Sequence, residues 1–226
     1  MNLERSDLRD EAEHDAFMTF VVKAADALTR HKWAYIGTAG ALAAVALIVM
    51  AVLHAGRLKE ERAAVLMGRA TAFIEIEQVE AARPLLEKMR DEYGGTRSGR
   101  EARYFLGMNA LQAEQLGEAR SELTAFLAAA KGQDFMTAAA QAGLAVCDER
   151  ERKWEDAARA WTKAALMDEQ GNFNAPVYLL NAALCWEQAG KAAEALPLLD
   201  RILEKYPKAA VKSRVEVVQA RMKARG

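Results

Sequence analysis

The side chains that most often carry out acid–base chemistry or bind metals are scarce in this chain of 226 residues. Its three histidines, His14, His31 and His54, all lie in the first quarter of the sequence. The remainder therefore lacks the commonest general base and the commonest metal ligand. Glycine-rich phosphate loops and nucleophile elbows are also absent from the sequence. We expect no catalytic residue, no metal ion, no cofactor and no small-molecule substrate.

Cys147 and Cys185 are the other pair with chemical potential. Two cysteines are too few for a disulfide scaffold, and they fit no metal-ligand spacing. A disulfide needs alpha carbons closer than about 7 Å, whereas the neighbouring helices expected to carry them would stack about 8–10 Å apart. We predict two free, buried thiols that act as small apolar side chains.

The composition predicts helices and gives no sign of a polyanionic partner. Net charge is −1, so we expect no nucleic acid partner. Glycine and proline total only 14 and 4 residues, and runs that could form strands are absent. Carboxylates alternate with Arg and Lys, which is typical of solvated helix faces. The fold class is predicted to be all-α.

One uncharged segment, Trp33 to Leu53, is long enough to cross a membrane. Its 21 residues match the roughly 20 that a spanning helix needs. A cleaved signal peptide is the alternative, but its apolar stretch would be about 7–15 residues long, and Leu53-His54-Ala55 is a poor cleavage site. We therefore predict a retained anchor over residues 33–55.

The tail of residues 1–32 is predicted to be cytoplasmic, although the positive charges on the two flanks do not decide the orientation. Within it, apolar residues recur at helical spacing, which fits either an amphipathic helix on the membrane or a helical lead-in to the span. They are Phe17, Phe20, Val21, Ala24 and Leu28.

The remaining chain repeats itself. The segment from Ala82 to Gly94 returns, with changes, from Ala195 to Pro207, which is 113 residues later. Weaker copies lie between them, one around Leu106-Gly107 and one around Leu144-Ala145. Units that begin near residues 63, 100, 138 and 176 are 37, 38 and 38 residues apart. Fixed periods of this length are typical of helical repeat arrays.

The pattern of these units resembles the tetratricopeptide repeat. Small residues of the first helix, Gly107, Ala145 and Ala183, let the paired helices approach closely, and Ala82, Ala119, Ala157 and Ala195 do the same from the second. Phe73, Trp161 and Trp186 are expected to fill the space between hairpins. The resemblance implies four hairpins over residues 56–208 (near 63–95, 100–131, 138–170 and 176–208). Turns are expected at Gly94-Gly95, Lys131-Gly132, Gly171-Asn172 and Ala209-Ala210, and a capping helix over 209–226, apolar at Val211, Val215, Val218 and Met222.

In the tetratricopeptide family, the first helices line a groove that binds peptides, so the resemblance implies a protein-binding groove here. Members that bind acidic chaperone tails use several Lys and Asn residues, whereas this groove offers only Arg150 as a cation. The alternative is that neighbouring helices cover these positions. The matching positions are Met67, Thr71, Ile74, Tyr104, Met108, Leu111, Val146, Glu149, Arg150, Leu180, Leu184 and Glu187.

The layout of tail, single span and repeats is similar to the family of single-span ancillary subunits of the bacterial Sec translocon. It implies a non-enzymatic scaffold in the bacterial inner membrane, with periplasmic repeats that recruit proteins or chaperones during translocation. An alternative is a structural subunit of another envelope machine, such as a secretion or motility apparatus, whose span packs against partners through Gly37 and Gly40. A hydrolase accessory domain is disfavoured by the missing histidines.

Overall fold

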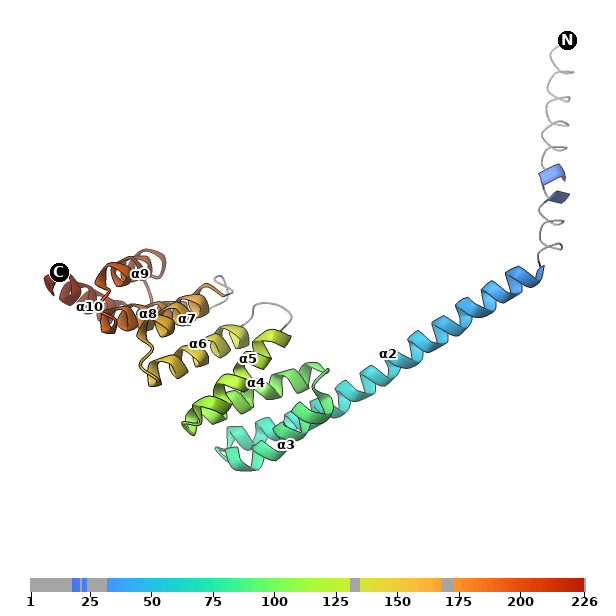
Figure 1. Ribbon diagram of the computed structural model, residues 1–226, viewed down its shortest axis with the longest axis horizontal. Coiled ribbons are helices and arrows are strands. Elements are labelled where there is room, and N and C mark those ends of the chain that lie inside the picture. Colours follow the sequence, from blue (N-terminus) through green and yellow to red (C-terminus); the bar gives the residue numbers. More distant parts are fainter. Residues whose placement is uncertain (1–17, 21, 24–31, 131–134, 168–172, 226) are drawn as a thin grey trace, which may run out of the picture. The chain divides into compact units, whose positions relative to one another are not determined.

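The computed structural model describes residues 18–20, 22–23, 32–130, 135–167 and 173–225 (Figure 1). The chain divides into two compact units, Met1–Arg57 and Leu58–Gly226. Most of the predicted tail helix lies outside the described residues, as do His14, His31 and the predicted turns at 131–132 and 171–172.

The long helix α2 (Lys32–Glu75) contains the predicted span. It is the one helix in the described part of the chain that is long and apolar enough to cross a membrane, and the apolar window is not buried at all. Within the span Trp33 is 77% exposed and Leu53 is 61% exposed. These side chains have no protein neighbours to cover them, which is the condition of a helix that faces lipid.

The second unit is a succession of helices that pack in chain order, visible as neighbours from green to red in Figure 1. This arrangement confirms the predicted all-α class with a solenoid of helical hairpins. The helices that follow α2 are α3 (Val79–Tyr93), α4 (Arg97–Gln112), α5 (Leu116–Ala129), α6 (Phe135–Arg150), α7 (Trp154–Leu166), α8 (Ala175–Gln188), α9 (Ala192–Lys205) and α10 (Lys212–Arg225).

The turn inside each hairpin has the same backbone conformation. A residue with positive φ ends the first helix at Glu77 (60°), Glu114 (58°), Arg152 (58°) and Gly190 (73°). These four positions are 37, 38 and 38 residues apart, the spacing that the sequence predicts for the units. The next residue's N–H reaches back to a carbonyl five positions earlier, as in a Schellman motif. These bonds are Gln78 to Phe73, Gln115 to Ala110, Lys153 to Asp148 and Lys191 to Trp186.

Small residues allow the close packing that the sequence predicts. A β-carbon added at Gly107 of α4 would lie 2.7 Å from the Leu123 side chain of α5, and one added at Gly143 of α6 would also lie 2.7 Å from it. Leu123 is fully buried and fills the slot between the two glycines. Ala145 and Ala183 are also completely buried. One leucine thus joins two successive hairpins.

The capping helix has the predicted polarity. Val215, Val218 and Met222 of α10 are buried in the same core cluster as α6 to α9, while Lys212 and Arg221 are exposed. This apolar face covers the last hairpin, as an array of stacked units requires at its end.

Candidate functional site

The predicted groove residues all lie on the first helices of the hairpins: the end of α2, α4, α6 and α8. Eight of them are half-buried, so part of each side chain remains accessible; they are Met67, Thr71, Ile74, Tyr104, Met108, Leu111, Val146 and Leu184. The structure therefore places apolar surface on successive first helices, in register with the repeat.

Leu180 is the exception. Its side chain is 1% exposed and belongs to the core cluster that spans α6 to α10. The sequence assigned it to the groove because it lies one helical turn before Leu184. Val177, one turn earlier on α8, is instead 39% exposed, and sequence analysis missed it. Its spacing of seven residues from Leu184 was the available signal.

The apolar floor of the groove is packed against the second helices. The Tyr104 ring lies 5.4 Å from the Phe105 ring and 5.6 Å from the Phe126 ring of α5. The added β-carbon at Gly143 would lie 3.5 Å from Met108 Sδ, so Met108 sits between α4 and α6. These residues both stabilise the stack and offer surface to a partner.

Glu149 connects three helices through one carboxylate oxygen. Its Oε1 accepts a hydrogen bond from Trp161 Nε1 of α7 at 2.7 Å and from Cys185 Sγ of α8 at 2.9 Å. Burial, followed by this contact with the Glu149 carboxylate, raises the pKa of the Cys185 thiol well above its usual range. Both cysteines are free and buried, as predicted. Cys185, however, is a hydrogen-bond donor as well as a space-filling side chain.

The charged residues predicted for the groove are engaged in ion pairs. Arg150 Nη1 lies 2.9 Å from Glu114 Oε1, between the hairpin turns of two units. Glu187 pairs with Arg221 of the capping helix at 2.6 Å. The capping helix thus occupies one predicted groove position, which supports in part the alternative that neighbouring elements cover the groove.

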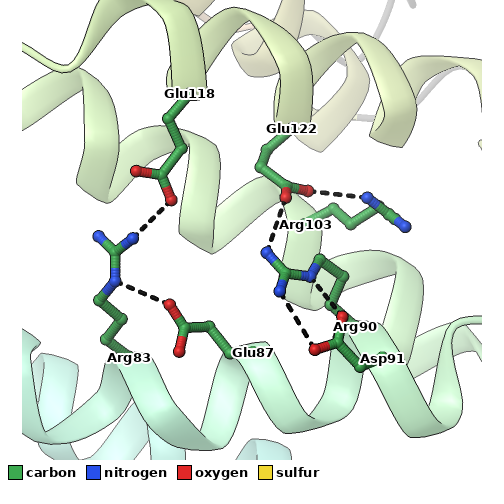
Figure 2. A network of polar contacts seen from close by, with 7 residues as sticks. All are labelled: Arg83, Glu87, Arg90, Asp91, Arg103, Glu118 and Glu122. Carbon is green, nitrogen blue, oxygen red and sulfur yellow. Dashed lines mark hydrogen bonds and ion pairs between the residues drawn. The ribbon is translucent and has the colours of Figure 1, made fainter.

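Two carboxylates depart from the prediction that acidic residues lie on solvated helix faces. Glu122 of α5 is 7% exposed, and Figure 2 shows it between Arg90 of α3 and Arg103 of α4. Its two oxygens lie 3.0 Å from Arg90 Nη1 and 2.9 Å from Arg103 Nη1. A buried carboxylate is stable only when it is paired in this way.

Asp148 of α6 is the second buried carboxylate, at 8% exposure. Arg120 Nη2 of α5 lies 2.9 Å from Asp148 Oδ1 and 3.1 Å from Glu151 Oε2. The two ionic clusters join α3 to α5 and α5 to α6, across the junctions between successive hairpins. The partners are far apart in sequence, so residue periodicity does not predict them.

Comparison with known families gives one match. Residues 178–209, which cover nearly all of α8 and α9, match the tetratricopeptide repeat family. Comparisons with curated proteins and with solved structures give no match. Repeats of this family typically serve as scaffolds for protein–protein interaction. The family match at the fourth hairpin, together with the helical hairpins that precede it, identifies this chain as a tetratricopeptide-repeat protein.

Proposed function

We propose that the protein is a membrane-anchored scaffold that binds a protein or peptide in the groove of its first helices. The observation that carries this proposal is the register of half-exposed apolar residues on α4, α6 and α8. Tyr104, Val146 and Leu184 recur on successive units, so an extended or helical segment can contact several of them at once. Met67 and Met108 add side chains that adapt to varied partners.

We further propose that α2 anchors the scaffold in the bacterial inner membrane, with the repeats at its extracytoplasmic face. The uncharged, exposed segment from Trp33 to Leu53 supports the anchor. The likeness of the layout to ancillary subunits of the Sec translocon supports a role in protein translocation or in chaperone recruitment. A reporter fused after Gly226 tests the orientation: periplasmic alkaline phosphatase should be active there, and an active cytoplasmic reporter would contradict it.

The groove is tested by charge at its two least packed apolar positions. Val146 and Leu184 are half-buried, so the double change Val146→Glu with Leu184→Glu places two carboxylates in the groove. Affinity capture from detergent-solubilised membranes should lose the partner. The matched control is Val217→Glu on α10, where the valine is 66% exposed and outside the groove. Equal capture by the control and the double variant, with helix content unchanged, would refute the groove.

A structural subunit of another envelope machine is the second candidate. Gly37 and Gly40 lie on the span, and a β-carbon added at either would meet nothing within 4 Å. Small residues of this kind let the backbone of a second membrane helix approach closely. Replacing both with Leu should release a partner bound through the span and leave groove binding unchanged.

A further inference from the structure

A pocket of about 520 Å³ lies between α5, α6 and α7, and it is separate from the groove residues. Its lining includes Arg120, Gln141, Lys153, Arg159 and Lys163. Nothing in the proposed scaffold function uses this pocket. Its polar lining is unusual for the space between stacked hairpins, which apolar side chains normally fill.

The internal repeat explains why the pocket exists. Gln141 and Asp148 of α6 are 38 residues before Leu179 and Trp186 of α8, so each pair occupies equivalent positions. In α8, Leu179 is 1% exposed and Trp186 packs against the core cluster. In α6 the smaller polar residues leave the corresponding space open to α5 and α7. The pocket is therefore a site where the chain has replaced apolar packing with polar groups.

The ion pairs around the pocket leave an excess of positive charge. Arg120 is paired with Asp148 at 2.9 Å, and Arg159 with Asp156 at 2.7 Å. Both of these carboxylates line the pocket and are neutralised by the arginines beside them. The Lys163 ammonium has no ion pair or hydrogen bond with any residue that the structure describes. It is thus a cation available to a ligand.

The Gln141 side chain gives an independent indication. The residue is 6% exposed and lines the pocket, yet its amide has no hydrogen-bond partner within the described parts of the chain. A buried amide that lacks a partner is costly. An oxyanion in the pocket would satisfy its N–H donors, since ionised acceptors form the stronger hydrogen bonds.

We propose that this pocket binds a carboxylate from an acidic segment of a partner polypeptide. The Lys163 ammonium and the Gln141 amide would donate to the carboxylate oxygens, and Arg159 and Lys153 would attract neighbouring acidic residues. The pocket spans three helices and opens at the surface, which suits a peptide side chain. The proposal does not rest on the groove, because α5 and α7 supply most of the lining.

The probe for this site is a fluorescein-labelled hexaglutamate peptide added to the full chain in neutral detergent. Fluorescence anisotropy should show saturable binding that weakens with salt. Lys163→Ala and Gln141→Leu should each weaken binding by about tenfold, because each removes a donor to a charged acceptor. Gln141→Leu installs the residue that α8 carries at the equivalent position, so the hairpin should still fold.

The matched control is Lys208→Ala, which removes one exposed positive charge outside the pocket. It should change the affinity by less than about twofold. The absence of hexaglutamate binding to the unmodified chain would overturn the proposal, as would equal weakening by Lys163→Ala and Lys208→Ala. Displacement of the peptide by inorganic phosphate at equal concentration would also overturn it, because the pocket would then be a phosphate site.

Discussion

The two halves of the hairpin array are held together by different forces. From α6 to α10 a single buried cluster runs through the structure, with Trp161, Leu179 and Leu199 among its members. From the end of α2 to α6 the apolar core is divided into three smaller clusters. Arginines paired with Glu122 and Asp148 join the hairpins there (Figure 2).

This difference teaches that one backbone repeat can be stacked by either kind of contact. Apolar contacts stabilise in proportion to buried area, whereas a buried ion pair gains little beyond the cost of its desolvation. We therefore expect the first two hairpins to open at a lower free energy than the last two. Repeat arrays unfold in this graded way because each unit contacts only its neighbours.

The largest expected effect comes from placing the polar residue of the first half in the second. Leu179→Gln removes a leucine that is 1% exposed and buries an amide in its place. We expect a loss of about 3 kcal/mol in the free energy of unfolding, measured with urea in neutral detergent. The reverse change, Gln141→Leu, should be neutral or stabilising. Equal destabilisation by both changes would remove the distinction between the halves.

The buried carboxylate of the first half should give the next effect. Glu122→Ala leaves Arg90 and Arg103 without their shared partner and should cost about 2 kcal/mol. Glu114→Ala breaks the exposed pair with Arg150 and should cost less than about 1 kcal/mol. Hydrogen exchange should show that Glu122→Ala unprotects α3 to α5 and spares α8 and α9. Uniform loss of protection would contradict independent halves.

The slot around Leu123 gives a smaller effect. Gly143→Ala places a methyl group 2.7 Å from that side chain, so α5 and α6 must shift, at a cost of about 1–2 kcal/mol. Gly117→Ala is the matched control, because the added group meets nothing within 4 Å and alanine favours a helix. Its midpoint of urea unfolding should stay the same or rise. A fall in both midpoints would show that Leu123 does not set the contact.

The smallest effect concerns the start of α4. Glu60 of α2 accepts hydrogen bonds from the Arg97 N–H (2.7 Å) and the Ser98 N–H (3.1 Å), which caps that helix. Partial burial raises the pKa of Glu60, but these hydrogen bonds outweigh it and hold the pKa below the ordinary value of 4.5. Glu60→Ala should cost about 1 kcal/mol at neutral pH.

Because the folded-state pKa of Glu60 is lowered, its contribution is complete above the unfolded pKa and is lost as the pH falls through the folded pKa. The stability difference between the unmodified chain and Glu60→Ala should therefore shrink below pH 4.5. Urea unfolding at a series of pH values measures it. A difference that grows in acid would contradict the role of the ionised carboxylate.

The sequence predicted the features that depend on local periodicity. The hairpin spacing, the small residues at the helix contacts and the apolar face of α10 all follow from residues three to eight positions apart. The ionic junctions were not predictable in this way, because Arg90 and Glu122 are 32 positions apart and meet only after the hairpins stack. Leu180 was misassigned for a related reason: helical spacing identifies a face but not what covers it.

The central claim is that a protein partner contacts the first helices of the repeats. Site-specific photo-crosslinking in native membranes tests it most directly, with benzoylphenylalanine at Leu184 and, as a matched position, at Val217. Leu184 is half-buried on α8, and Val217 is exposed on α10. We predict a discrete crosslinked product from Leu184 and none from Val217. The same product from both positions, or from Val217 alone, would contradict the groove as the binding surface.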